Sequence, residues 1–271
     1  MFVALFLLAL PSLAAVAPVT CGATLSGAKI YTLAADLDCS TATTPITVTN
    51  RAVLNLNNHT YVGKIIMDGS RAQLKDGTIE CTGDLFDVCV KVLGTGRHII
   101  RNVVFLGSAV VSHLASTIGV SSGSDNNSLV GNSIINIISF SALIVGGSNN
   151  ILQQNRIIGA DQEGFFIRGD GNQLIGNYAA GIQENFQIDG NNNVLTDNVA
   201  SDGSSGYEVS GTGNRLTRNW VTNSFQGFLI LSGSNIIENN IAVLNAFDLA
   251  GCDSNIYQNN IFQTSNIVNC D

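Results

Sequence analysis

The chain is poor in charge, in proline and in lysine. Only 12% of its 271 residues are charged, 3 are proline, and no lysine follows Lys91. So few prolines exclude collagen-like and polyproline architectures, and a net charge of −8 argues against a nucleic-acid partner. At 45% hydrophobic residues, the chain is too apolar to be disordered. We therefore expect a folded protein that stays in solution with few charged side chains.

Beyond the N-terminus, the chain also lacks an apolar run long enough to span a bilayer. Residues 1–17 carry no charge and combine a short apolar run with small residues such as Ser12 and Ala14. This pattern is typical of a signal peptide, and we expect cleavage after Ala14. Residues 18–271 would then form a single exported domain that has no membrane partner after cleavage.

Metal-ligand spacing is absent as well. The six cysteines form no C-x-x-C pair and the three histidines are scattered, so we assign no metal site to them. In an exported chain, cysteines favour disulfides, and sequential pairing is the simplest connectivity. The expected pairs are Cys21–Cys39, Cys81–Cys89 and Cys252–Cys270. The first and last would staple the two ends of the domain.

Asparagine is abundant, with 31 copies, and much of it follows a repeat. The pattern Asn-x-apolar-x-x-Asn occurs seven times, and its first Asn advances by 20 to 23 residues. The copies are Asn127/Asn132, Asn150/Asn155, Asn172/Asn177, Asn193/Asn198, Asn214/Asn219, Asn235/Asn240 and Asn255/Asn260. A looser copy ends at Asn102 and degenerate ones end near Asp76 and Asn57, which gives about ten units.

Each unit contains three short segments of period two, separated by Gly, Asn and Ser, and helical periodicity is absent. The segment before each Asn motif has apolar first and third residues, as in Phe165-Phe-Ile167 and Phe247-Asp-Leu249. Three short strands cannot bury their inner faces alone, but stacked units can. The repeat therefore predicts an all-β parallel β-helix, with the second Asn of each unit stacked into a ladder at one corner.

The N-terminal region resembles a known group of proteins. Its segments Cys21-Gly-Ala-Thr24, Thr32 to Cys39 and Val53 to Thr60, followed by Gly63, are similar to those of right-handed parallel β-helix proteins of the pectate-lyase-like superfamily. The resemblance implies a single-stranded right-handed parallel β-helix of about ten coils with an Asn ladder, in an uncharacterised secreted branch. That superfamily includes polysaccharide lyases, uronan epimerases, glycoside hydrolases and surface proteins. The chain carries neither the polygalacturonase nor the pectate lyase catalytic motifs.

In that superfamily the substrate groove runs along the outer face of one sheet. By analogy, the outward positions of the segment before the Asn motif form the candidate site. The first outward row reads Phe166, Gln187, Glu208, Leu229 and Asp248, and the second reads Arg168, Asp189, Ser210, Leu231 and Ala250. Coil spacing and strand rise place the Cα atoms of Glu208 and Asp189 about 8 Å apart, and those of Glu208 and Asp248 about 10 Å apart.

Once side-chain direction is allowed for, both pairs lie within reach of the carboxylate separation of inverting glycoside hydrolysis, about 6.5 to 9.5 Å. We expect Glu208 with Asp189 or Asp248 to act as acid and base, and Arg168 to steady a charged sugar. The alternative to a role at the substrate is that Arg168 and Asp189 form a structural ion pair across adjacent strands, which contributes little. The residues expected to bind substrate are Gln187, Phe166, Asp161 and Glu163. The loops that enter this sheet carry Asp161, Glu163, Glu184 and Asp202, and these carboxylates could also hold a Ca²⁺ ion or simply be solvated.

The leading functional hypothesis is a secreted carbohydrate-active protein: a polysaccharide lyase, an epimerase or a hydrolase. The first alternative is a non-catalytic extracellular glycan-binding or surface protein, and the second is a small-molecule isomerase or cyclase on a β-helix scaffold. We expect a monomer whose partner is a polysaccharide or glycan. A net charge of −8 favours a neutral glycan unless Ca²⁺ bridges the protein to a polyanion.

Overall fold

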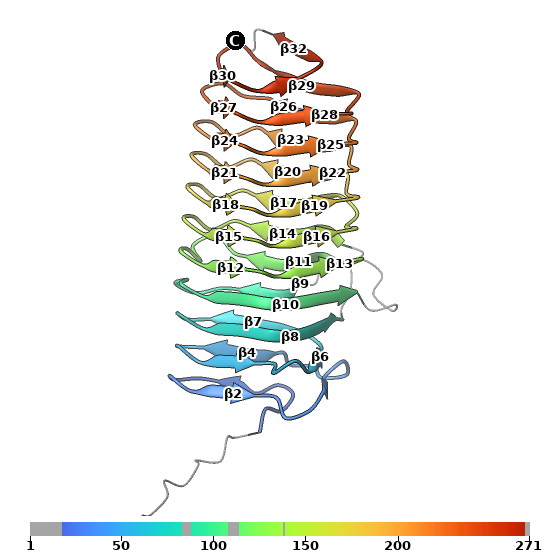
Figure 1. The fold of residues 1–271 in the computed structure, drawn as a ribbon. Coiled ribbons are helices and arrows are strands. Elements are labelled where there is room, and N and C mark those ends of the chain that lie inside the picture. Colours follow the sequence, from blue (N-terminus) through green and yellow to red (C-terminus); the bar gives the residue numbers. More distant parts are fainter. Residues whose placement is uncertain (1–17, 83–87, 108–113, 138, 269–271) are drawn as a thin grey trace, which may run out of the picture.

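The computed structural model describes residues 18–82, 88–107, 114–137 and 139–268. The predicted signal peptide, residues 1–17, therefore lies outside the described residues. Every strand pairing among those described is parallel, and the chain winds into a column of stacked coils (Figure 1). None of the described segments forms a helix long and apolar enough to cross a bilayer.

One face of the column is a sheet of twelve strands, here called sheet A. Its strands, from the N-terminal to the C-terminal end, are β1 (Thr24–Leu25), β4 (Ile46–Thr49), β7 (Ile65–Asp68), β9 (Val88–Val92), β11 (Leu114–Val120), β14 (Ser139–Val145), β17 (Glu163–Ile167), β20 (Glu184–Ile188), β23 (Ser205–Val209), β26 (Gln226–Ile230), β29 (Phe247–Cys252) and β32 (Ser265–Val268). Eleven steps between neighbouring strands correspond to about eleven turns, close to the ten expected.

The other two faces are built from shorter strands. Sheet B stacks β2 (Ile30–Thr32), β5 (Val53–Asn55), β8 (Gln73–Cys81), β10 (Ile99–Gly107), β12 (Ser128–Val130), β15 (Ile151–Gln153), β18 (Gln173–Ile175), β21 (Val194–Thr196), β24 (Arg215–Thr217), β27 (Ile236–Glu238) and β30 (Ile256–Gln258). Sheet C shares β8 and β10 and adds β3 (Leu37–Asp38), β6 (Thr60–Val62), β13 (Ser133–Ile135), β16 (Arg156–Ile158), β19 (Tyr178–Ala180), β22 (Val199–Ser201), β25 (Trp220–Thr222), β28 (Ile241–Val243) and β31 (Ile261–Phe262).

The repeated asparagines form the expected ladder at the corner between sheets B and C. The backbone N–H and the side-chain amide of Asn177 both donate to Asn198 Oδ1, at 2.8 and 2.9 Å, and the amide also donates to the Leu152 carbonyl at 2.8 Å. The first asparagines of the motif stack in a second ladder, in which the Asn172 N–H donates to Asn193 Oδ1 at 2.7 Å. These asparagines are buried, so the ladders satisfy the backbone where the chain turns.

The ladders do not extend into the first coils. The side chain of Asn127 receives the backbone N–H of His98, and that of Asn132 receives the N–H of Val103, so His98 and Val103 occupy the two Asn positions of the preceding coil. Asn102, which ends the looser copy of the motif, lies one residue before the ladder position. In this coil the corner does not interrupt the strand, and β10 continues through it as one nine-residue strand.

The inward residues of sheet A form a continuous core. Four aromatic side chains stack on one another, with ring centroids 4.8, 4.7 and 4.9 Å apart. They are Phe165, Phe186, Tyr207 and Phe228, and all are fully buried. The prediction that the first and third residues of this segment face inward is confirmed for these four coils.

Two of the expected disulfides are present. Cys21–Cys39 closes the N-terminal end, with a sequence separation of 18, and Cys81–Cys89 links β8 to β9. The third expected pair, Cys252–Cys270, includes Cys270, which lies outside the described residues. The two observed bridges therefore tie down the first coils, where the Asn ladders are missing.

Candidate functional site

The outer face of sheet A carries the candidate site, and strand register fixes its order. Strand pairing aligns one outward residue per coil in a single row that runs along the axis. From the N-terminal side, this row reads Lys91, Gly119, Ile144, Phe166, Gln187, Glu208, Leu229 and Ala250. Gln187 is therefore directly opposite Glu208, as the sequence predicted.

Four carboxylates gather around the middle of this row. Glu163 and Glu184 begin β17 and β20 and are paired with each other across adjacent coils. Asp189 follows β20, and Glu208 lies in β23 one coil further on. We call Glu163, Glu184, Asp189 and Glu208 the acidic cluster. Glu163 and Glu184 were expected in loops, but both belong to strands of sheet A.

Burial and mutual repulsion make two of these carboxylates weaker acids. Desolvation raises the pKa of Glu208, and the nearby charge of Asp189 raises it further. The pKa of Glu184 is also raised, first by desolvation and then by the charges of Glu208, Glu163 and Asp189. Glu184 and Glu208 therefore hold their protons more readily than isolated glutamates would.

Hydrogen bonds fix the positions of the other two carboxylates. The Ser210 hydroxyl donates to Asp189 Oδ1 at 2.7 Å, and the Gln187 amide donates to the same oxygen at 3.4 Å. The Ser141 hydroxyl donates to Glu163 Oε2. Serines on adjacent coils thus hold both carboxylates in place.

The ion pair between Arg168 and Asp189, the alternative interpretation of these two residues, does not form. The Arg168 guanidinium instead lies over the ring of Phe166, 5.6 Å from its centroid. Arg168 leaves the end of β17, and two residues along an extended strand bring a side chain back to the same face, above Phe166. Arg168 therefore covers one face of the aromatic ring that was expected to stack on a sugar.

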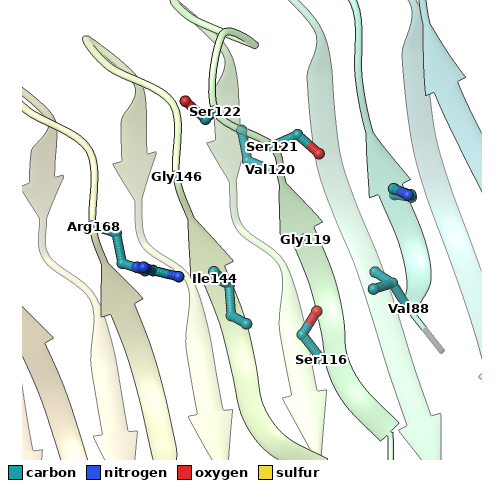
Figure 2. A pocket seen from close by; sticks show the side chains of 10 residues that line it. Val88, Ser116, Gly119, Val120, Ser121, Ser122, Ile144, Gly146 and Arg168 are labelled. Atoms are coloured by element: carbon teal, nitrogen blue, oxygen red, sulfur yellow. The ribbon is translucent and has the colours of Figure 1, made fainter. Parts of the chain in front are cut away.

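A hollow lies on the N-terminal side of the cluster, on the same outer face. It has a volume of about 510 Å³. It is lined by Val88, Lys91, Ser116, Gly119, Val120, Ser121, Ser122, Ile144, Gly146 and Arg168. Figure 2 shows Arg168 just beyond the end of β17 and Ile144 on the neighbouring strand β14, with Ser121 and Ser122 in the turn beyond Val120. The hollow and the acidic cluster therefore form one continuous surface, joined at Arg168 and Phe166.

The expected outward position of Asp248 is wrong. The repeat length carries Glu208 to Leu229 and then to Ala250, so Asp248 lies two residues before the outward row. Its side chain is 1% exposed, and its Oδ2 accepts the backbone N–H groups of Gln263 and Thr264 at 2.8 and 3.2 Å. Asp248 therefore secures the turn of the last coil and does not face the acidic cluster. The same two-residue shift removes Ala250 from the Arg168 row and leaves the Phe247 ring half exposed.

Asp161 lies just before β17 and is exposed, and its backbone N–H donates to the Ser139 carbonyl at 3.1 Å. It borders the acidic cluster through its chain neighbour Glu163.

Within the described ranges, no three His, Cys, Asp or Glu side chains come together closely enough to hold a metal ion. The carboxylates of the acidic cluster are therefore spread along the sheet and do not converge on one point.

The structure thus brings Glu208, Asp189, Gln187 and Glu163 together, with Arg168 and Phe166 at the border, and removes Asp248. Sequence reasoning missed Lys91 as a part of this face. Its signal was the alternation Val88-Cys-Val-Lys-Val92, which marks Lys91 as an outward residue of a strand. Without an Asn motif in this coil, however, nothing in the repeat aligned Lys91 with Phe166.

The match to known proteins agrees with this architecture. Residues 63–247, about two thirds of the chain, match the family described as the right-handed beta helix region. No curated protein sequence matches the chain significantly. The stacked parallel coils and this match together show that the chain belongs to the right-handed beta helix family.

Proposed function

We propose that this chain is a secreted carbohydrate-active protein of the pectate-lyase-like type, and that the acidic cluster is its catalytic site. Hydrolysis of a glycosidic bond is the reaction that the arrangement supports best. The observation that carries this proposal is the pairing of Glu208, whose pKa is raised, with the hydrogen-bonded Asp189 on one exposed face.

The separation of the two carboxylates suits an inverting mechanism. Glu208 and Asp189 are one coil and two residues apart, since Glu208 is opposite Gln187. This register places their Cα atoms about 8 Å apart. From these positions the side chains can reach the separation of roughly 6.5 to 9.5 Å between carboxyl groups that leaves room for a water molecule.

The two side chains differ in the way that such a mechanism needs. Glu208, whose pKa is raised, donates its proton to the glycosidic oxygen as the bond to the anomeric carbon breaks. Asp189 accepts a proton from the water that attacks this carbon from the opposite side. Ser210 holds Asp189 for this role through the 2.7 Å hydrogen bond. The proton gained by Asp189 returns to solvent, and Glu208 takes up a new one.

The remaining polar residues of the face supply binding. Gln187 lies between the two carboxylates and can donate to sugar hydroxyls, while Glu163 and Asp161 border the site on the preceding coil. A polyanion placed directly over the acidic cluster would be repelled, so the sugar bound there is uncharged. The Cys21–Cys39 and Cys81–Cys89 bridges support the exported location that this role requires.

The test is a screen of the purified protein against neutral glycans, pectin, alginate and hyaluronan, with and without Ca²⁺. We expect cleavage of a neutral glycan that produces new reducing ends. Glu208→Gln and Asp189→Asn should each lower kcat at least a hundredfold, because each removes one proton-transfer group. Glu80→Gln, on β8 away from sheet A, is the matched control and should leave activity unchanged.

Three results would contradict the catalytic assignment. They are an activity that survives Glu208→Gln, an unsaturated product typical of a lyase, and saturable glycan binding with no turnover. The last would assign the face to a non-catalytic glycan-binding protein. Circular dichroism of each variant checks that the β-helix is intact.

A further inference from the structure

The outer face of sheet A has two electrostatic poles. The acidic cluster occupies β17, β20 and β23 and the residues that follow them, whereas Lys91 and Arg168 line the hollow on the N-terminal side. This contrast is unusual because the whole chain carries a net charge of −8 and its last lysine is Lys91. Two of its few cations thus contribute to one hollow.

Glycines create the hollow. In the outward row, Gly119 separates Lys91 from Ile144, so one coil contributes no side chain there. A Cβ at Gly119 would come within 3.1 Å of Val88 and 3.2 Å of the Ser116 hydroxyl, and one at Gly146 within 3.1 Å of the Ser122 backbone nitrogen. Because these glycines have no side chains, the surface between the two cations is recessed. The volume of about 510 Å³ is in the usual range of small-molecule sites.

Neither cation is neutralised by a carboxylate of the described chain. The ion pairs found there involve His59, Lys75, Arg215 and Arg218. Arg168 packs on the Phe166 ring, a contact in which no carboxylate takes part. Lys91 is exposed beside the hollow. Two cations at one hollow, neither paired with a carboxylate of the described residues, provide charge that can bind an anion.

We propose that this hollow binds an anionic group, a carboxylate, sulfate or phosphate, held between Lys91 and Arg168. Taken with the proposed function, on which this part rests, it defines the substrate as a mainly neutral glycan with an acidic group at one end. Lys91 and Arg168 are three coils and two residues apart, so their Cα atoms are about 16 Å apart. The acidic cluster starts immediately beyond Arg168, which excludes a second charge on the sugars placed there.

The direct test uses small anions and does not depend on catalysis. Backbone amide NMR of the full chain is recorded during titration with sodium sulfate, phosphate or glucuronate, against sodium chloride at matched ionic strength. We expect saturable shifts of the Gly119, Ser121 and Gly146 amides, and the anion that binds most tightly identifies the group. Lys91→Gln and Arg168→Gln should each weaken this binding about three- to fivefold, the effect of one partly exposed charge.

Lys29→Gln is the control, because Lys29 is exposed on the sheet B side next to β2. It should leave the titration unchanged. The proposal is overturned if the shifts do not saturate, if chloride reproduces them, or if Lys29→Gln weakens binding as much as Lys91→Gln. A saturable anion site in a protein without glycosidase activity would refute the proposed function and leave the anion site standing. Glycosidase activity without a saturable anion site would keep the proposed function and refute the acidic group in the substrate.

Discussion

Removing one hydroxyl group from the core should stabilise the protein. Tyr207 is the third ring of the aromatic stack, and the other three rings are phenylalanine. Its side chain is fully buried, and its hydroxyl has no hydrogen-bond partner among the described residues. Burial also raises the pKa of Tyr207 well above 10.0, so the group stays neutral. Tyr207→Phe therefore removes a polar atom that is never satisfied in the folded state.

The size of the effect follows from two opposing terms. A buried polar group without a partner costs about 1 to 3 kcal/mol, because the unfolded chain hydrogen-bonds it to water. Removal of the oxygen also leaves a small void, which lowers the gain. The stacking with Phe186 and Phe228 is kept, since phenylalanine forms the same contacts. We expect a net gain of about 1 kcal/mol in the free energy of unfolding, or about 2 to 4 °C in Tm.

The measurement is guanidinium-induced unfolding of the disulfide-intact chain, followed by circular dichroism and by tryptophan fluorescence. Phe186→Tyr is the reverse control: it places a second hydroxyl in the same buried stack and should lower the free energy of unfolding. If Tyr207→Phe destabilises the protein, the hydroxyl forms a bond that stabilises the fold. The idea of an unsatisfied polar atom in the stack would then be refuted.

Two further predictions concern stability. Asn177→Ala should lower the free energy of unfolding by about 2 to 4 kcal/mol in the same assay, because it removes the buried hydrogen bonds of Asn177 to the Leu152 carbonyl and from the backbone and side-chain amides of Asn155. A loss below 0.5 kcal/mol would contradict the structural role of the ladder. Because the pKa of Glu184 is raised above 4.5, the folded state binds more protons than the unfolded state between the two values, so stability should fall as pH rises through that window. Glu184→Gln should reduce this fall, and an unchanged pH profile would argue against the repulsion.

The repeat made the architecture readable from the sequence. Units of about 21 residues with three period-two segments bury their inner faces by stacking into a parallel β-helix, because each unit is covered only by the next one. The same regularity predicted the ladder at Asn177 and Asn198, and it placed Gln187 opposite Glu208. Long-range contacts are predictable here because each one repeats a local pattern at fixed spacing.

The last coil shows where this reasoning fails. Phe247-Asp-Leu249 looks like Phe228-Leu-Ile230, but the backbone pairs Phe228 with Leu249. The pairing keeps the 21-residue step, whereas the similarity of the letters suggested 19. Burying Leu249 continues the core stack, and Asp248 then turns inward to accept the N–H groups of the final turn. Constant repeat length was therefore the better guide to the outward row.

The site was only partly predictable, for a related reason. The acidic cluster lies in coils that carry the full Asn motif, so alignment with Glu208 and Asp189 followed from counting residues. The hollow begins in a coil where His98 and Val103 replace the ladder asparagines and the spacing is irregular. Without that motif, Lys91 could be identified as an outward residue but not placed relative to Arg168. Only the paired strands β9, β11, β14 and β17 supply this register.

In this solenoid, side chains that point inward determine stability, and side chains that point outward on sheet A are available for chemistry. Inward rows and corner asparagines are constrained by packing and by buried hydrogen bonds, so a change such as Asn177→Ala acts on folding. Outward rows on sheet A are constrained only by strand propensity, so each coil can present a different group at a fixed step of about 4.8 Å. A row that passes from Lys91 through Phe166 to Glu208 therefore encodes an order of charges along the axis. Because that order is directional, a chain-like ligand with one acidic end matches it in one orientation and is repelled in the other.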